Sequence, residues 1–371
     1  MKIGLIGLNR TGKTTLFRLL TGKTDAINES QAGFAGKNTV NIGTGIVPDE
    51  RVDFLSQLYK PKKTTYARIE LTDVAGFAVS ADDHSGGAAR FLNDVRPCDA
   101  LVHVLRAFES DSQEGVDPAG DLEAVETEML FADLEMIEKR IARIKAGKKV
   151  TKEHEVEIAL LERCYKQLED GGSILDMEMT EPERISIRGF SFLTEKPRLA
   201  VLNIDEEQQS KQHQLDVPQN EVLFSTSEKL QTLCGKINIP LLTLCAQIEM
   251  EINNLPIEDR QEFVEDMGIK EPGIEVLAQA IYKLLGLISF LTVGEDEVRA
   301  WTIEKETVAQ AAAGKIHTDI ERGFIRAEVV KYKDIFELGT MARVKEKGLF
   351  KLEGKQYIVE DGDIINFRFN V

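Results

Sequence analysis

Short apolar runs alternate with segments of helical periodicity along the first part of the chain and again near its middle. Buried-strand patterns lie at residues 2–8, 67–77 and 198–207, residues 89–108 have the pattern of helix, turn and strand, and Leu16, Leu19 and Leu20 follow helical spacing. Strands that alternate with helices build parallel sheets with crossover helices. The pattern therefore predicts an α/β domain.

A second pattern occupies the middle of the chain. Its apolar residues repeat with a spacing of four, three, four and three, at Leu130, Leu134, Ile137, Ile141 and Ile144. This is a heptad seam. After Gly147 a further helical pattern continues to Gly171. The two patterns predict an antiparallel helical hairpin.

The joint of this hairpin is basic within an acidic chain. Its cationic residues are Arg143, Lys145, Lys148, Lys149 and Lys152. Lysines near a helix C-terminus interact favourably with the helix dipole, which is one explanation. A basic tip that contacts RNA phosphates is the other, and the sequence leaves both open.

The C-terminal part consists of short strand-like pieces. Ile365, Phe367 and Phe369 alternate with polar residues, which predicts a half-buried strand. Asp361-Gly362 before it predicts a hairpin turn. Together these pieces predict a small α+β domain.

Composition narrows the class of protein. A chain of 371 residues with 42% hydrophobic content is long enough for two or three cores. It has neither a run of about 20 apolar residues nor a signal-peptide pattern. The cysteines Cys98, Cys164, Cys234 and Cys245 lack metal spacing, so we expect buried, reduced thiols and a cytoplasmic protein without a membrane partner. A net charge of −17 argues against a body that coats nucleic acid, although a local basic patch could still bind it.

The first loop carries a phosphate-binding motif. Gly7 to Thr14 fits G-x-x-x-x-G-K-[ST] between a predicted strand and a predicted helix. In such loops main-chain amides and the helix N-terminus hold the phosphates, the lysine reaches the β- and γ-phosphates, and the hydroxyl binds Mg²⁺. The predicted nucleotide-binding residues here are Asn9, Arg10, Thr11, Gly12, Lys13, Thr14 and Thr15, with Lys13 also catalytic.

A second phosphate element follows the strand at residues 67–73. Asp73 is predicted to hold Mg²⁺ together with Thr14, and the Gly76 amide is predicted to contact the γ-phosphate as a catalytic group.

A third element is predicted to recognise the base. Asn203, Ile204 and Glu206 stand where GTPases carry Asn-Lys-x-Asp, and Cys245-Ala246 fits the remaining base-side loop. Because Glu is one methylene longer than the Asp that pairs with guanine, we expect the fit to guanine to be lost.

These elements, in this order, resemble the YchF/Obg-like ATPase family of translation-factor-class P-loop proteins. The resemblance covers nearly the whole chain and includes residues 46–76, 97–108, 122–141, 300–330 and 352–371. It implies an α/β P-loop nucleotide-binding domain at 1–117 and 190–286, a helical arm at 118–189, and a TGS domain (a small β-grasp-like α+β module) at 287–371. It also implies Mg²⁺-dependent hydrolysis of ATP in preference to GTP, and association with the ribosome or rRNA through the arm and the TGS domain.

The sequence departs from the family pattern at several points. Phe77 stands where many GTPases have a glutamine, as this family expects, so another group must orient water. Lys37 replaces the switch threonine, with Thr39 as the nearest hydroxyl, and Arg10 replaces an asparagine that is a candidate potassium ligand in related enzymes.

Arg10 has two interpretations. The loop also resembles that of guanylate-binding proteins and atlastins, which implies a cis arginine finger that makes the enzyme independent of potassium. The other interpretation is a surface ion pair of little energetic consequence.

Three functions remain open from the sequence: an ATPase switch, a GTPase of the same architecture, and a non-catalytic module that retains nucleotide and binds the ribosome. The sequence does not indicate the oligomeric state.

Overall fold

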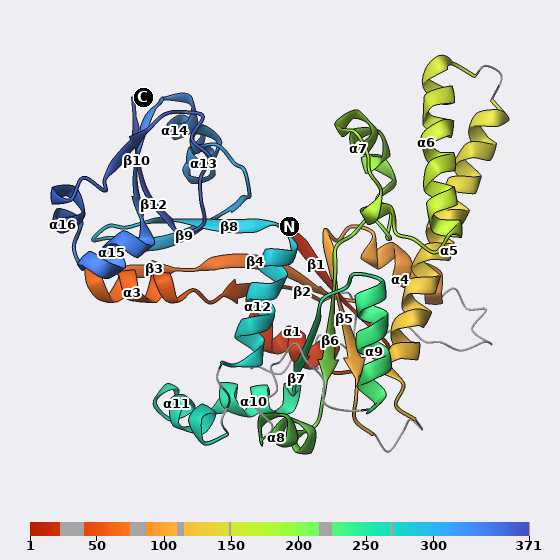
Figure 1. The fold of residues 1–371 in the computed structure, drawn as a ribbon, viewed down its shortest axis with the longest axis horizontal. Helices are drawn as coiled ribbons and strands as arrows, with labels where there is room; N and C mark the ends of the chain where they lie inside the picture. The colour runs from red at the N-terminus through yellow and green to blue at the C-terminus, as the bar shows by residue number, and fades with distance from the viewer. Residues whose placement is uncertain are drawn as a thin grey trace, which may run out of the picture. The chain divides into compact units, whose positions relative to one another are not determined.

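A computed structural model describes residues 1–22, 41–74, 87–109, 115–147, 150–214, 225–267, 269 and 271–370. Contacts divide the chain into two compact units (Figure 1). Unit 1 comprises Met1–Gly43 and Glu70–Ile274, and unit 2 comprises Thr44–Ile69 and Glu275–Val371. Among the described residues no helix is long and apolar enough to cross a membrane.

The first sheet has six strands in the order β2-β4-β1-β5-β6-β7. Their bounds are β1 Lys2–Ile6, β2 Asn41–Val47, β4 Ala67–Asp73, β5 Ala100–Arg106, β6 Arg198–Asn203 and β7 Leu241–Leu244. Strand β1 pairs in parallel with β4 and β5, and β6 pairs in parallel with β5 and β7. The predicted parallel α/β sheet is thus confirmed.

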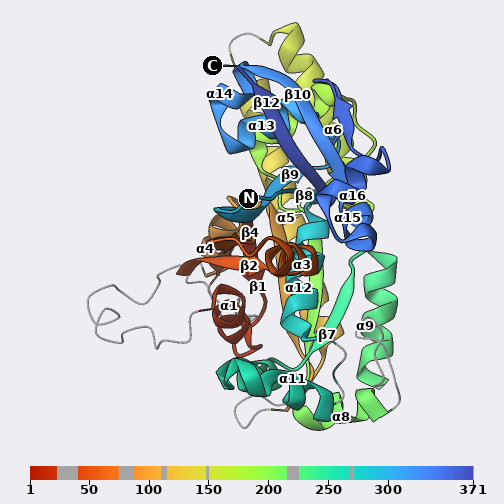
Figure 2. The ribbon, with the colours of Figure 1, turned by 90° about the vertical axis from the view of Figure 1, so that its left-hand side faces the viewer.

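Helices cover both faces of this sheet, and α1 and α9 lie on opposite sides of it (Figure 2). The helices of unit 1 are α1 Lys13–Thr21, α4 Gly87–Val95, α5 Pro118–Lys145, α6 Lys152–Glu169, α7 Glu181–Ile187, α8 Glu206–Gln214, α9 Ser225–Lys236, α10 Ala246–Asn254 and α11 Ile257–Asp266. Leu122 of α5 and Leu230 of α9 are fully buried in one cluster with Leu105 of β5. Apolar side chains of α5 and α9 therefore anchor both helices to the sheet.

The predicted helical hairpin is present. Helices α5 and α6 run side by side (Figure 1), and Arg140 of α5 donates from Nε to Glu157 of α6 at 2.7 Å. Ile137, which belongs to the predicted heptad seam, is fully buried against Leu161. The first half of α5 packs on the sheet, so one continuous helix carries the arm.

Unit 2 contains the second sheet, whose order is β11-β10-β12-β8-β9-β3. Its strands are β3 Lys63–Thr65, β8 Leu287–Thr292, β9 Glu297–Glu304, β10 Phe324–Lys331, β11 Lys351–Glu353 and β12 Asp363–Phe369. The remaining helices are α3 Glu50–Tyr59, α12 Gly273–Leu284, α13 Ala309–Ile316, α14 Thr318–Arg322, α15 Tyr332–Leu338 and α16 Met341–Glu346. Helices and strands mix in this unit, as the predicted α+β domain requires.

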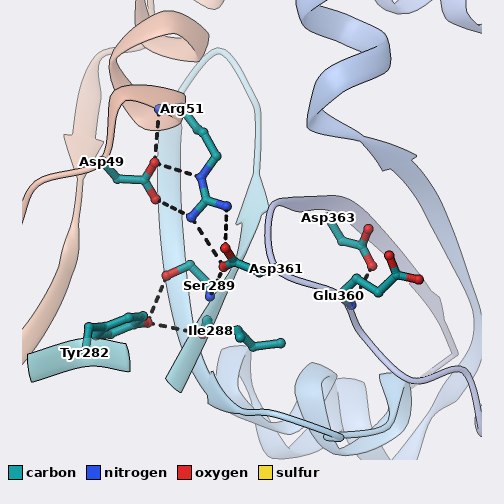
Figure 3. A network of polar contacts seen from close by, with 8 residues as sticks. All are labelled: Asp49, Arg51, Tyr282, Ile288, Ser289, Glu360, Asp361 and Asp363. Atoms are coloured by element: carbon teal, nitrogen blue, oxygen red, sulfur yellow. Dashed lines mark hydrogen bonds and ion pairs between the residues drawn. The ribbon is translucent and has the colours of Figure 1, made fainter. Parts of the chain in front are cut away.

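The prediction of a hairpin at Asp361-Gly362 is wrong. Strands β11 and β12 both pair with β10 and not with each other, so the turn joins no hairpin. Instead, the Asp361 carboxylate accepts the Ser289 amide at 2.9 Å and the Arg51 guanidinium at 2.8 Å (Figure 3). The polar turn residue forms a tertiary contact, which a local turn pattern cannot reveal.

Arg51 is also tied to the start of its own helix. Asp49 is the N-cap of α3, and its carboxylate accepts the Arg51 amide at 3.0 Å and Nε at 2.8 Å. Two carboxylates therefore share one guanidinium, as Figure 3 shows. Paired in this way, Arg51 joins α3 to the loop before β12.

Candidate nucleotide-binding site

The loop between β1 and α1 has the conformation that phosphate binding requires. Gly7 and Gly12 have φ values of +138° and +95°, which residues other than glycine rarely adopt. A Cβ on Gly7 would lie 2.3 Å from the Val104 carbonyl oxygen, so the glycine permits close packing on β5. Gly12 is the N-cap of α1, and the amides of the helix N-terminus face the loop.

Lys13 lies inside this loop. Its Nζ donates to the carbonyl oxygen of Gly7 at 3.0 Å and to that of Leu8. Burial lowers the pKa of Lys13 to about 8, although the Asp73 carboxylate acts in the opposite direction. An ammonium in this position is close enough to the loop amides to share the phosphates with them.

The two residues predicted to bind metal lie together. The Thr14 hydroxyl donates to Asp73 Oδ2 at 3.0 Å, although 59 residues separate the two in sequence. One hydroxyl and one carboxylate are the oxygen donors with which Mg²⁺ is held beside substrate phosphates and water. Among the residues that the structure describes, no group of three His, Cys, Asp or Glu side chains could hold a metal. A site completed by phosphate and water agrees with this donor set.

Asn41 is a neighbour of this pair that the sequence did not reveal. Its Nδ2 lies 3.5 Å from Asp73 Oδ2, at the start of β2. The sequence pointed instead to Lys37, at the position of the switch threonine, and to Thr39 as the nearest hydroxyl. The alternating pattern of β2 marks a strand, but it does not tell which polar residue meets Asp73.

Asn203 connects the phosphate loop with the base-side loop. Its Nδ2 donates to the Thr11 carbonyl oxygen at 3.0 Å, and its Oδ1 accepts the Ala246 amide at 3.0 Å. The side chain is 4% exposed, so both hydrogen bonds are shielded from water. The phosphate loop, Asp73 at the end of β4 and the loop after β6 thus lie at one end of the parallel sheet, where such folds bind ligands.

The other base-side residues differ in exposure. Ile204 is 2% exposed, and its side chain packs in the core cluster with Leu202. Cys245 is buried at the N-cap of α10. Glu206 is exposed in the first turn of α8, whereas the Asp205 carboxylate accepts the Gln208 amide at 2.8 Å and caps that helix. The Glu206 carboxylate therefore faces solvent, whereas that of Asp205 caps the helix.

Arg10 and Asn9 lie at the exposed crest of the phosphate loop. Arg10 has a φ of 62°, in the left-handed region. Thr11 is buried, and its hydroxyl donates to the Leu8 carbonyl oxygen at 3.2 Å; Thr15 is half-buried in α1. Gly76, Lys37, Thr39, Phe77, Lys148 and Lys149 lie outside the described residues.

Fold and site together define a P-loop nucleoside triphosphatase with an inserted helical arm. A family model described as a 50S ribosome-binding GTPase matches residues 2–139, and the model YchF-GTPase_C, described as a protein of unknown function (DUF933), matches residues 287–370.

Relatives match over the full length. The chain is 40% identical to the ribosome-binding ATPase YchF of Bacillus subtilis over 99% of both chains, and 38% identical to that of Escherichia coli O157:H7 over 100% of this chain and 99% of the relative. A solved structure of the Schizosaccharomyces pombe YchF GTPase superposes with a TM-score of 0.83 at 29% identity, covering 99% of this chain and 97% of that one. The chain belongs to the YchF family, and the resemblance found in the sequence is confirmed.

Proposed function

We propose that this triphosphatase hydrolyses Mg²⁺-bound ATP in preference to GTP and acts as a ribosome-associated switch in the cytoplasm. The observation that carries the proposal is the meeting of Lys13, Thr14 and Asp73 at the N-terminus of α1, with Asn203 joining the two loops beside it. This cluster supplies one ammonium, main-chain amides and two oxygen ligands for Mg²⁺ around the phosphates. Mg²⁺, when bound, neutralises charge that develops on the β- and γ-phosphoryl oxygens.

The preference for ATP is supported by the base-side loop. The Asn203 amide binds the phosphate loop through Nδ2 and the base-side loop through Oδ1. Glu206 stands in the sequence where GTPases carry the guanine-binding aspartate. With the longer Glu206 side chain at the surface, guanine has no matched carboxylate, and hydrogen-bonding sites discriminate strongly only when the geometry fits.

Competition of a fluorescent ADP with ATP and GTP tests this preference. We expect ATP to compete better than GTP in the parent protein and the ratio to shift toward GTP in Glu206→Asp. Glu207→Asp is the matched control, because Glu207 is the next residue and its exposed carboxylate pairs with Lys211 at 2.6 Å. Equal competition by the two nucleotides, with no effect of Glu206→Asp, would favour the alternative of a GTPase or unselective triphosphatase.

Hydrolysis itself separates the enzyme from a nucleotide-retaining module. Phosphate release by the parent protein is compared with Lys13→Ala in the presence of ribosomes. We expect release only by the parent, whereas nucleotide that is bound and never hydrolysed would support the non-catalytic alternative. If the protein is an enzyme, we propose that Arg10 of the same chain supplies positive charge to the γ-phosphoryl group and that the Gly76 amide contacts the same group.

Ribosome association is proposed from the printed names of the relatives. The arm and the C-terminal domain are the contacts we favour. At the arm tip, Arg143 and Lys152 are exposed, while Lys145 lies 3.4 Å from Glu162. Co-sedimentation with ribosomes should weaken when Arg143 and Lys152 are changed to Glu. Unchanged co-sedimentation would show that the arm tip does not contribute to ribosome binding.

A further inference from the structure

One face of the helical arm packs on the segment that follows it. Ile187 of α7 is buried in the same apolar cluster as Leu161 of α6. Arg163 of α6 donates to the Glu183 carboxylate of α7. The short helix α7 and the chain around it therefore cover this face of the α5–α6 hairpin, and Figure 1 shows α7 next to the arm.

A different face of the hairpin forms a groove of about 610 Å³. The described residues that line it belong to α5, to α6 or to the C-cap of α6. Tyr165 is one of them, and it points about 200° away from Arg163 around α6, because the two lie two positions apart. The groove and the face that α7 covers are therefore on opposite sides of α6.

Both helices line the groove with the same spacing. The lining residues of α5 are Glu138, Ile141, Ala142 and Lys145. Those of α6 are Glu162, Tyr165, Lys166 and Glu169. In each helix the positions follow i, i+3, i+4 and i+7, which is one face of an α-helix. Two neighbouring helices with such faces leave between them the position at which a third helix of a bundle packs.

The floor of the groove is apolar and held in place. Ile141 and the Tyr165 ring are half-buried, and Ala142 between them is exposed. The Tyr165 hydroxyl donates to Glu138 Oε1 at 2.8 Å, which joins the two helices and fixes the ring. An apolar floor with polar groups along its edge is the composition of grooves that bind an amphipathic helix.

The edge of the groove is acidic at one end. Carboxylates outnumber ammonium groups four to two among the lining residues. Lys145 lies 3.4 Å from Glu162, so these two charges offset each other. Glu138, Glu169 and the C-cap Asp170 lie toward the other end, where α6 ends and its dipole adds negative potential. This end attracts cations and repels phosphates.

We propose that the groove binds a cationic amphipathic helix of a partner protein. Apolar side chains on one face of that helix contact Ile141, Ala142 and Tyr165. Its Lys or Arg side chains lie at the end that carries Glu138 and Glu169. The proposal goes beyond the proposed function and does not depend on it, because neither the nucleotide nor the ribosome takes part in this contact.

A second copy of this chain and RNA are the competing occupants. The groove of a second copy is equally concave, so two grooves placed face to face cannot fill each other. RNA would bring its phosphates against Glu138, Glu169 and Asp170. A separate helix with positive charge matches both the shape and the charge of the groove.

The test uses the full-length protein and a fluorescently labelled peptide of about 18 residues, which is long enough to form a helix. Leu recurs in it at i, i+3, i+4 and i+7, and Lys occupies most other positions. One control peptide has the same composition in scrambled order, and another keeps the Leu stripe but has Glu in place of Lys. By anisotropy we expect the striped Lys peptide to bind about tenfold tighter or more than either control.

Ala142→Lys tests whether the peptide occupies the groove. Lys is nearly as good a helix former as Ala, and at this exposed position it places a long cationic side chain in the groove. We expect the striped Lys peptide to bind about tenfold more weakly or less. Val156→Lys is the matched control, because Val156 is a 69% exposed residue of α6 outside the groove and the charge change is the same.

Glu169→Gln tests the acidic edge and guards against misfolding of Ala142→Lys. Removing one exposed carboxylate should weaken binding about threefold. Glu178→Gln is its control, since Glu178 is an exposed carboxylate of the arm that does not line the groove. All four variants should bind ATP like the parent, which shows that any loss of peptide binding is local.

Several results would overturn the proposal. One is that the parent does not bind the striped Lys peptide, and another is that the scrambled or the Glu peptide binds equally well. Equal binding by Ala142→Lys and Val156→Lys would place the peptide elsewhere on the acidic surface. A parent dimer that Ala142→Lys converts to a monomer would identify a second copy as the occupant. A uridine hexanucleotide that competes with the peptide in the parent and not in Ala142→Lys would identify RNA.

Discussion

Arg10 is the residue whose position and chemistry distinguish this phosphate loop. It lies at the exposed crest with a φ of 62°, in a loop that Gly7 allows to pack close to β5. We propose that the Arg10 guanidinium contacts the γ-phosphoryl group from this position. The same charge would replace a potassium ion, which connects one side chain to the ion dependence of the enzyme.

We predict that Arg10→Ala lowers ATP turnover by about two orders of magnitude or more, because arginine fingers contribute roughly 10³–10⁵ in rate. Arg10→Lys should recover only part of this loss, since Lys lacks the planar fork of donors. Parent turnover should be the same in KCl and NaCl. Phosphate release measures all three, and Arg188→Ala, at an exposed arginine of unit 1, is the control. Near-parental rates in both Arg10 variants would eliminate the finger.

The cysteines give a second residue-scale prediction. Burial raises the pKa of Cys98, Cys164 and Cys234 to about 11 and raises that of Cys245 as well. At pH 8 only about one thiol in a thousand is then ionised at the first three, and the thiolate is the reactive form. We expect a chromogenic disulfide reagent to label the native protein slowly and all four cysteines after unfolding in urea. Rapid labelling of the native protein would contradict the buried, reduced state.

At the scale of elements, buried polar contacts fix the arm to the sheet domain. Asp133 of α5 is fully buried, and its Oδ2 accepts both the amide and the hydroxyl of Thr194, at 2.8 and 2.9 Å. Arg96 lies 3.4 Å from the other carboxylate oxygen. These bonds tie the middle of the long helix to the chain that leads into β6.

We predict that Asp133→Ala destabilises the protein by about 2–4 kcal/mol, because Thr194 keeps two donors without acceptors and Arg96 loses its counter-charge. Glu135→Ala is the matched control on the same helix. Glu135 is exposed and pairs with Lys139 at i,i+4, which contributes about 0.5 kcal/mol or less. Urea unfolding followed by circular dichroism measures both variants, and equal midpoints would show that the anchor has no such effect.

Elements and motif loops were predictable because their signals are local. The heptad seam around Ile137 and the loop ending in Lys13-Thr14 depend on spacing within a few residues, and the structure confirms these elements. Contacts between distant residues were not predictable. Asn41 beside Asp73 depends on the register of two strands, and no single-sequence pattern encodes it.

Hydrophobic burial also changed the interpretation of one site residue. Ile204 was predicted to bind the base because it stands where GTPases carry the lysine of Asn-Lys-x-Asp; its side chain packs in the core, and its role at the base stays a prediction. A loop position that follows a strand can point to either side, and only the packing of α5 and β6 decides which. The domain boundaries and the roles of the individual site residues stay predictions.

At the scale of the whole molecule, unit 2 is built from two distant parts of the sequence, residues 44–69 and 275–371. Strand β3 adds to the edge of β9 in parallel, Phe54 packs against Phe336 with ring centroids 5.0 Å apart, and Arg51 binds Asp361. Val52 and Leu55 are fully buried, and burying such side chains contributes about 1.5–3 kcal/mol each. Residues 275–371 alone therefore lack part of their sheet and part of their core.

We predict that a peptide of residues 44–69, added in trans to a fragment of residues 275–371, binds it and raises its thermal midpoint. A ligand that binds only the folded state stabilises it by about 2.7 kcal/mol at 100 times its Kd, which corresponds to about 10 °C or more for a domain of this size. The Arg51→Ala peptide should require a higher concentration for the same rise, because Asp49 and Asp361 would then face each other without the intervening cation. A scrambled peptide of the same composition controls for unspecific effects. If the fragment melts at the same temperature with and without the native peptide, the second sheet is complete without β3, and the division of the chain into these two units does not describe how it folds.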